Sequence, residues 1–338
     1  MTTSPPAPAG RYVWDPAAGP DGALLPERTA EAAPALVADS WLVEDGRVRA
    51  LPAHARRFRD ACGRLLGTPP GPVTAFLRAA TGLLPQRGRW FPRVEARPGI
   101  HGPHLTLWLR PAPPRGGPVV LWHPGMVDPR AVPWAKGPDL VLLGRLREAA
   151  RAAGADEPLL LSATGQVREG GTTSLLWWRG TTLCAPPPGP DLLPGVTRAL
   201  LTAEVADAGH RVVFETATAQ DLAGVPVWAV NALHGIRPVA GWLNLADELP
   251  PPPDSSAEAE RWQARLDRLA LPAHPGLVPD ADDPAPGTAG PLPQTDVVRP
   301  ARAAHRPPAG RTHRRPLPDS RLPLPDSRLG SADPQQRG

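Results

Sequence analysis

The chain of 338 residues is long enough for one large domain or two ordinary ones, and its formal net charge is +4. The arginines of its central part are scattered rather than clustered, which argues against a nucleic-acid-binding protein. No apolar run approaches the ~18 residues of a membrane span, and the N-terminus lacks signal-peptide features, so we expect a cytoplasmic protein that does not bind membranes. Cys62 and Cys184 lack metal-site spacing, and we expect two buried thiols and no metal.

The first part of the chain predicts an unstructured beginning, a hairpin and two helices. Residues 1–32 are rich in alanine, proline and glycine and predict little regular structure. Residues 35–43 resemble a strand, and Asp45-Gly46 predicts a tight turn into a return strand at 48–51, because glycine accepts a positive φ. Helices are expected over 52–67 and 72–84, followed by strands at 94–96, 105–109 and 119–123.

The second part predicts a sheet of many short strands. A helix is expected over 138–153, because apolar residues recur at helical spacing and Gly154 follows them. Further helices are expected over 195–208 and from 255 to about 271. Many short strands with few helices predict a barrel-like or strongly curved sheet rather than a doubly wound one. The predicted strands span 158–162, 174–179, 182–185, 211–216, 227–231 and 237–244.

The last part of the chain is rich in proline, alanine, glycine and arginine and repeats residues 316–322 at 323–329. Such a composition buries too little apolar surface to fold, so we expect a disordered tail. Its arginines could bind an acidic partner, but a dispensable extension is the simpler interpretation. The expected organisation is an extension at 1–32, an N-terminal α/β domain at 33–123, a linker at 124–135, a C-terminal domain at 136–272 and a tail at 273–338.

Lys136 is the only lysine among the 37 Lys and Arg residues of the chain. Arginine stays protonated, whereas a lysine amine can lose its proton and attack a carbonyl. A single lysine in an arginine-biased chain therefore suggests a position where positive charge alone does not suffice. The alternative is a surface lysine without a function. Lys136 follows the expected linker directly, at a junction between two domains where pockets often form.

Several motifs around Lys136 resemble, in this order, those of the class IV aminotransferases, the fold-type IV enzymes that use pyridoxal phosphate. The resemblance covers about residues 35–245 and depends on motif order, because each motif alone is weak. The motifs are His54-Ala55-Arg56-Arg57-Phe58, Lys136, Gly165-Gln166-Val167-Arg168-Glu169-Gly170, Gly195-Val196-Thr197-Arg198 and Asn231-Ala232-Leu233-His234-Gly235.

The resemblance implies a role for each motif residue. Lys136 would form the internal aldimine with pyridoxal 5'-phosphate and act as the base that transfers the substrate proton. Glu169 would hold the proton on the pyridine nitrogen. Arg57, Val196, Thr197, Asn231 and Ala232 would bind the phosphate, because an arginine fork and free N–H groups at a helix start suit its oxygens. Arg237 is our suggestion for the arginine that binds the substrate carboxylate. Each of these could instead be an ordinary surface or structural residue.

The resemblance also implies a fold and an assembly. We expect an α/β (α+β) protein with the two-domain fold of type IV pyridoxal-phosphate enzymes. It would have a small N-terminal α/β domain and a larger C-terminal domain with a curved, pseudo-barrel sheet. Homodimers are typical of the family, with the site near the interface, so we expect a homodimer acting on a small-molecule substrate.

The sequence departs from the family pattern at several positions. Ser174 stands where an asparagine is usual, and Val141 stands where branched-chain enzymes have a tyrosine. Residues 51–65 and 231–233 are more similar to 4-amino-4-deoxychorismate lyases, which release 4-aminobenzoate and pyruvate. A D-amino acid aminotransferase is the alternative enzyme. A catalytically inactive scaffold or regulatory protein is the alternative outside enzymes, because of the lost signature residues.

Overall fold

Three β-sheets organise the residues that the computed structural model describes, which are 9–19, 22–27, 34–99, 102–245, 248–281 and 283. The chain divides into two units, Met1–Val298 and Arg299–Gly338, and all described residues belong to the first. Most of the predicted tail, including its repeat, lies outside the described residues, so its disorder stays a prediction. Within the described ranges, no helix is long and apolar enough to cross a membrane.

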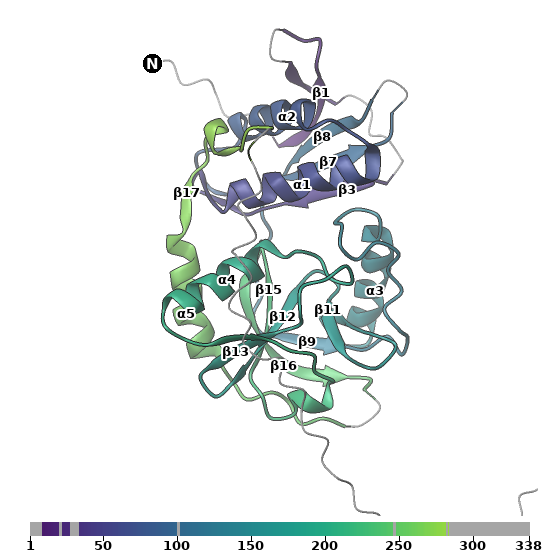
Figure 1. The fold of residues 1–338 in the computed structure, drawn as a ribbon, viewed down its shortest axis with the longest axis vertical. Helices are drawn as coiled ribbons and strands as arrows, with labels where there is room; N and C mark the ends of the chain where they lie inside the picture. The colour runs from purple at the N-terminus through teal and green to yellow at the C-terminus, as the bar shows by residue number, and fades with distance from the viewer. Residues whose placement is uncertain are drawn as a thin grey trace, which may run out of the picture. The chain divides into compact units, whose positions relative to one another are not determined.

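An antiparallel five-stranded sheet forms the N-terminal part of the molecule (Figure 1). Its helix-facing side is apolar because alternate residues of neighbouring strands align, as Val94 does with Leu107. These side chains bury Phe58 of α1 and Phe76 of α2 in one core. The strand order is β2 (Ala23–Pro26), β1 (Gly10–Asp15), β8 (His104–Leu109), β7 (Arg93–Arg97) and β3 (Val37–Ser40), and the helices are α1 (Leu51–Leu66) and α2 (Pro70–Gly82).

Strands β1 and β2 correct the prediction of little regular structure for residues 1–32. β1 pairs with β8, with Arg11 opposite Trp108, and Tyr12 is buried in the N-terminal core. The pairing satisfies backbone groups that β8 would otherwise expose at the edge of the sheet. This partner lies far away in the sequence, so local composition could not indicate it.

The predicted Asp45-Gly46 turn is confirmed. Both residues have positive φ, 46° and 71°, and they join β4 (Val43–Glu44) to β5 (Arg47–Arg49). The predicted continuous strand at 35–43 is wrong, because residues 41–42 interrupt it and β4 enters a separate four-stranded sheet. That sheet has the order β17 (Ala270–Pro272), β5, β4 and β6 (Arg89–Trp90).

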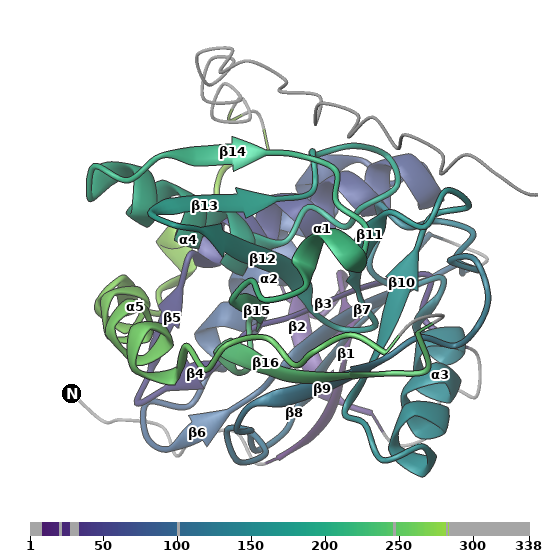
Figure 2. The same ribbon diagram turned by 90° about the horizontal axis from the view of Figure 1, so that it is seen from below.

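The C-terminal sheet closes into a barrel, which confirms the predicted strongly curved sheet. Closure follows because β11 pairs with both β10 and β12. Helices α4 and α5 pack on one side of the barrel, and α3 packs on β10 at another side (Figure 2). The barrel strands are β9 (Val119–Trp122), β10 (Glu157–Leu161), β11 (Val167–Gly170), β12 (Ser174–Arg179), β15 (Val227–Asn231) and β16 (Gly235–Leu243), with β13 (Thr182–Ala185) and β14 (Val212–Phe214) continuing from β12. The helices are α3 (Leu140–Ala152), α4 (Val196–Asp207) and α5 (Ser256–Arg268).

Two expected boundaries differ from the strand pairing. β9 was expected in the N-terminal domain, but it lies between β10 and β16 in the barrel. The helix expected to run to about 271 ends at Arg268, and β17 then pairs with β5; a 3-10 helix at Pro275–Leu277 follows within the range expected as tail. Val278 then packs in the N-terminal core, which explains why this segment has regular structure. Both cysteines are buried and free, as predicted.

Candidate active site

A cavity of about 350 Å³ lies where the N-terminal sheet meets the barrel. Ser40, Phe91, Arg93 and Arg110 line it from the N-terminal sheet and its neighbouring segments, and we call these four residues the N-terminal wall. All but one of the predicted site residues also line it. These are Arg57, Lys136, Glu169, Val196, Thr197, Asn231 and Ala232.

The backbone of Lys136 is fixed against β3. The Ala38 N–H donates a hydrogen bond of 2.7 Å to the Lys136 carbonyl oxygen. The next residue, Gly137, has a φ of 150°, and a Cβ there would lie 2.3 Å from the Leu36 carbonyl oxygen. Only glycine allows this close approach. Strand β3 therefore sets where the lysine side chain enters the cavity.

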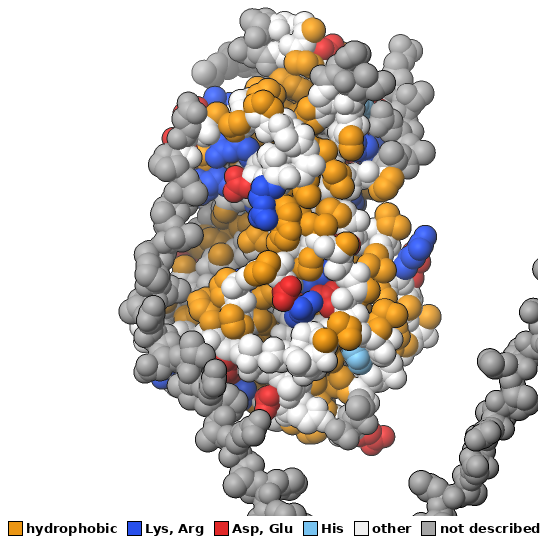
Figure 3. All heavy atoms as spheres, turned by 45° about the vertical axis from the view of Figure 1, so that its right-hand side comes forward, with side chains coloured by type: hydrophobic (Ala, Val, Ile, Leu, Met, Phe, Trp, Pro, Cys, Tyr) orange, Lys and Arg blue, Asp and Glu red, His pale blue; other side chains and the backbone are white. Residues whose placement is uncertain are grey.

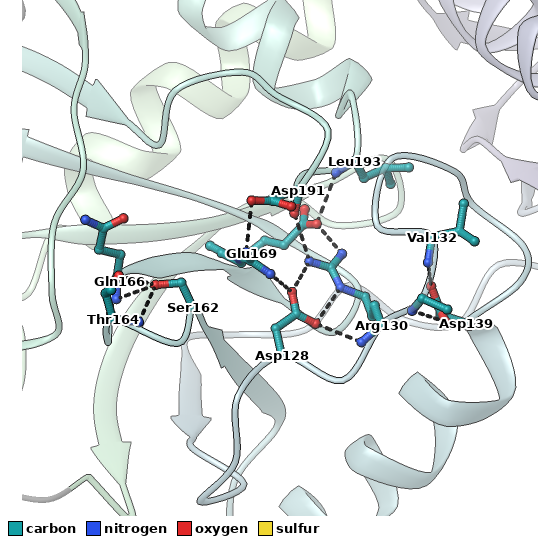
Figure 4. Close-up of polar contacts among 12 residues, drawn as sticks. Asp128, Arg130, Val132, Asp139, Ser162, Thr164, Gln166, Glu169, Asp191 and Leu193 are labelled. Atoms are coloured by element: carbon teal, nitrogen blue, oxygen red, sulfur yellow. Dashed lines mark hydrogen bonds and ion pairs between the residues drawn. The ribbon is translucent and has the colours of Figure 1, made fainter.

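Asp139 anchors the same loop from its other side. Its carboxylate accepts the N–H groups of Ala131 at 3.0 Å and Val132 at 2.9 Å (Figure 4). Asp139 is buried, so these charge-assisted bonds are sheltered from water. The loop before Lys136 is thus held at both ends, and the amine starts from a rigid backbone.

The Lys136 amine has no hydrogen bond or ion pair with another described residue. Burial lowers the pKa of Lys136 to about 8, and the positive charges of Arg57 and Arg93 act in the same direction. The charges of Asp39 and Glu169 oppose this shift. A substantial fraction of the amine is therefore neutral near physiological pH, as a nucleophile requires.

Glu169 is a buried carboxylate at the end of β11. Its Oε1 atom accepts the Leu193 N–H at 3.1 Å and forms a short ion pair with Arg130 (Figure 4). Burial raises the pKa of Glu169, and the charge of Arg130 opposes that shift. The Oε2 atom makes no hydrogen bond among the described residues, so the carboxylate can accept one more hydrogen bond inside the cavity.

Arg57 is held by a second buried carboxylate that sequence reasoning missed. Its Nε atom donates to Asp39 Oδ2 at 2.7 Å, and its Nη2 atom donates to Oδ1 at 2.8 Å. The third nitrogen, Nη1, donates to the Pro194 carbonyl oxygen at 3.0 Å. Arg57 therefore joins β3 to the loop before α4, and its orientation toward the cavity is fixed.

Asp39 also contacts His54, whose Nδ1 atom lies 2.8 Å from Asp39 Oδ1. Although burial alone would raise it, the pKa of Asp39 lies well below its ordinary value because of Arg57 and His54. Burial lowers the pKa of His54, so the neutral imidazole donates its Nδ1 proton to Asp39. His54 therefore supports Asp39, which in turn holds Arg57.

The start of α4 provides free donors to the cavity. Val196 and Thr197 are its first residues, and the N–H groups of a first helical turn have no partner within the helix. The Thr197 hydroxyl makes no hydrogen bond among the described residues. A Cβ on Gly195 would lie 2.5 Å from the Ser174 hydroxyl oxygen, so glycine lets β12 approach the helix start closely. This arrangement suits an anion such as a phosphate.

The turn after β15 completes this cradle. The Asn231 side chain accepts the N–H groups of Leu233 at 3.1 Å and His234 at 2.8 Å, so it shapes the turn rather than facing a ligand. The Ala232 carbonyl accepts Arg49 at 3.1 Å. What this turn can offer an anion is therefore backbone N–H.

Arg237 does not line the cavity, in contrast to the predicted substrate role. Its Nε atom donates to the Gly117 carbonyl at 2.6 Å, and its Nη2 atom lies 3.3 Å from the Pro118 carbonyl. On β16 the side chain points toward this loop, so it supports the backbone before β9. No local pattern distinguishes an arginine that faces a pocket from one that holds a loop.

Sequence reasoning gave no role to three arginines that line the cavity, Arg93, Arg110 and Arg147. Arg110 donates to the Phe91 carbonyl at 3.0 Å but forms no ion pair with a described carboxylate. Arg93 shares Glu95 with two other arginines, and Arg147 of α3 pairs with Glu157 at 3.2 Å. In a chain rich in arginine, nothing in the sequence distinguished these three arginines from the others.

Comparison with known proteins identifies the family. The model of the family described as amino-transferase class IV matches residues 36–242, more than half of the chain. The chain therefore belongs to the class IV aminotransferase family, which confirms the resemblance. A comparison with curated proteins gives no match.

Solved structures share the fold at low sequence identity. A hypothetical aminotransferase from Mycobacterium tuberculosis in its PLP-bound form has a TM-score of 0.62 and 22% identity, covering 73% of this chain and 96% of that one. A branched-chain aminotransferase from Thermoproteus uzoniensis with norvaline has a TM-score of 0.63 and 19% identity, covering 75% and 98%. The branched-chain amino acid aminotransferase from Escherichia coli has a TM-score of 0.63 and 16% identity, covering 80% and 96%. The predicted fold class is confirmed.

Proposed function

We propose that this chain is a pyridoxal-phosphate-dependent enzyme in which Lys136 binds the cofactor covalently. The observation that carries the proposal is a buried Lys136, without an ion-pair partner and with its pKa lowered to about 8, in the same cavity as Glu169 and the α4 start. Family membership and PLP-bound structural neighbours support the cofactor. Bound there, the cofactor would supply a ring that withdraws electrons from the substrate α-carbon.

The residues present fit this group at both of its charged ends. Glu169 Oε2 would accept a hydrogen bond from the protonated ring nitrogen, because Oε1 is already occupied. Arg57, Thr197 and the backbone N–H groups of Val196 and Ala232 would bind the phosphate. Lys136 would then carry the proton that leaves the substrate α-carbon.

An absorbance spectrum of the purified protein tests this proposal. A visible band that disappears on borohydride reduction and is absent in Lys136→Ala is the expected result, because only a Schiff base gives both. Arg261→Ala, an exposed position on α5, is the control and should keep the band. A colourless protein that takes up no added pyridoxal phosphate would contradict the proposal and favour an inactive scaffold.

For the reaction, we propose a lyase of the aminodeoxychorismate type that yields 4-aminobenzoate and pyruvate. The similarity of residues 51–65 and 231–233 supports this branch, and a substrate with two carboxylates would match the cationic N-terminal wall. The alternative is transfer of the amino group by a D-amino acid-type aminotransferase. Pyruvate release without an added keto acid would support the lyase, and a strict need for a keto acid would support the aminotransferase.

We also propose a homodimer that uses the face around α3. Only Ala150 of this helix is buried, while Val141 is 52% exposed. Met126 and Val127, in the loop before Lys136, are also exposed. Figure 3, turned so that the α3 side comes forward, shows apolar side chains gathered across this face. Light scattering should give twice the chain mass, and Val141→Glu should produce monomers.

A further inference from the structure

Arg130 is a buried cation whose nitrogens all have assigned partners. Nε and Nη2 donate to the two oxygens of Asp128, at 2.9 and 2.7 Å. Nη2 also lies 3.3 Å from the Asp191 carbonyl oxygen, and Nη1 forms the short ion pair with Glu169. Figure 4 shows the guanidinium between the carboxylates of Asp128 and Glu169.

We infer that Arg130 is a positioning residue that keeps the buried Glu169 ionised and turns its free oxygen toward the cavity. The consequence of this inference rests on the proposed function. An ionised Glu169 has no proton of its own, so it can only accept a hydrogen bond from the cofactor. A neutral Glu169 would carry its own proton and could donate it instead. Arg130 therefore determines whether Glu169 accepts a hydrogen bond from the protonated ring nitrogen or donates one to a neutral ring nitrogen.

The charge of Arg130 is needed because Glu169 lies out of water. Burial disfavours a carboxylate and raises the pKa of Glu169, while the neighbouring guanidinium favours the ionised form. Arg130 itself stays charged, because Asp128 and Glu169 raise its pKa above the ordinary value despite burial. Without this cation, Glu169 would be a buried carboxylate with one neutral N–H donor, from Leu193. The charge of Arg198 would still favour the ionised form, but Arg198 makes no hydrogen bond with Glu169 among the described residues.

The orientation of Arg130 comes from Asp128. A bidentate arginine–carboxylate pair fixes the guanidinium plane, so only Nη1 is left to reach Glu169. Glu169 Oε1 is then occupied by Arg130 and Leu193, and Oε2 is left for a ligand. Asp128 is buried with Arg130, so the pair is sheltered from salt.

The same network contains a matched control. Arg168 donates to Asp128 at 3.2 Å and to Asp191 at 2.9 Å, so it shares both neighbours of Arg130. It makes no hydrogen bond or ion pair with Glu169 among the described residues. Removing Arg168 therefore disturbs the network without removing the charge beside Glu169.

Infrared difference spectra of the cofactor-free chain test the protonation of Glu169 directly. Wild type and Arg168→Gln should show no protonated-carboxyl band that depends on Glu169 at the pH used for cofactor binding. Arg130→Gln should gain such a band, the double variant with Glu169→Gln should lack it, and Arg130→Lys should suppress it. A band already present in wild type, or none in folded Arg130→Gln, would overturn the inference.

Cofactor titration gives the second readout. Arg130→Gln should weaken pyridoxal phosphate binding about tenfold or more and shift the pH dependence of the bound spectrum, with Arg168→Gln within about twofold of wild type. If Arg130→Gln does not fold, Glu169→Gln takes its place, and a wild-type pH dependence in that variant would overturn the inference. A wild type that binds no pyridoxal phosphate, yet shows the infrared result, would reject the proposed function alone.

Discussion

Two groups of charged residues share the cavity, and they differ in how completely they are paired. In the first, which we call the paired group, Asp39 holds Arg57 and Arg130 holds Glu169. In the second, the N-terminal wall, Arg110 has no carboxylate partner among the described residues and Arg93 shares Glu95 with Arg11 and Arg97. The paired group is complete before any ligand arrives, whereas the wall has surplus positive charge. A preorganised site suits a resident group, and a surplus suits an anionic substrate.

The comparison predicts that the largest loss of stability follows from breaking the paired group. Asp39→Ala should lower the free energy of unfolding by about 3–5 kcal/mol, because it leaves Arg57 without its buried carboxylate. It should also weaken pyridoxal phosphate binding, since Arg57 loses its orientation. Urea denaturation and cofactor titration measure the two effects.

The control for Asp39→Ala is Glu44→Ala. Glu44 also pairs with two arginines, Arg89 and Arg115, but its side chain is 37% exposed. Exposed pairs contribute about 0–1 kcal/mol, so this variant should lose no more than that. Equal losses in the two variants would remove the distinction between the paired group and an ordinary surface network.

The N-terminal wall should respond in the opposite way. Arg110→Gln should raise KM for a dicarboxylate substrate about 10- to 100-fold, because a charge-assisted bond is lost. Its free energy of unfolding should fall by no more than about 1 kcal/mol, the size of the ring contacts of Arg110 with Phe91 and Trp108. Steady-state kinetics with one acidic and one neutral substrate, together with urea denaturation, check both statements. An unchanged KM for the acidic substrate would contradict a substrate role for Arg110.

The pH dependence of pyridoxal phosphate capture tests whether burial and the neighbouring charges lower the pKa of Lys136. With a pKa of about 8, the neutral amine rises with pH from about a tenth at pH 7 to about nine tenths at pH 9. Capture of pyridoxal phosphate, trapped by reduction, should therefore increase about tenfold over this interval and then level off. Arg57→Gln removes a cation that lowers the pKa, so its profile should move to higher pH. A wild-type profile still rising steeply above pH 10 would mean that burial does not lower the pKa of Lys136.

Sequence reasoning succeeded where the signal was local. Helix α1, the Asp45-Gly46 turn and the short barrel strands follow from periodicity and turn chemistry within a few residues. The order of the family motifs likewise predicted that Lys136, Glu169 and the start of α4 would share one site, and all three line the cavity. Strands β1 and β17 were missed because each is defined by a partner strand far along the chain.

The partners of the charged residues were missed for a related reason. In a chain rich in arginine, no local feature indicates which carboxylate an arginine will meet after folding. Asp39 of β3 pairs with Arg57 of α1, and Glu169 of β11 pairs with Arg130 of the loop before Lys136. The only indication in the sequence was that Arg130 lies close to Asp128 and shortly before Lys136. Its pairing with Glu169 became evident only when the structure placed this loop beside β11.

The smallest effect on activity is expected for Arg237, the arginine that sequence analysis assigned to the substrate. Arg237→Leu should leave KM for an acidic substrate within about twofold of wild type, because the side chain does not line the cavity. It should lower the free energy of unfolding by about 1–3 kcal/mol, since the Gly117 and Pro118 carbonyls lose their donor. Comparing it with Arg110→Gln in the same assays separates an arginine that holds a loop from one that binds an anion. A large rise in KM for Arg237→Leu, with stability unchanged, would restore the original assignment and remove the N-terminal wall as the site of substrate recognition.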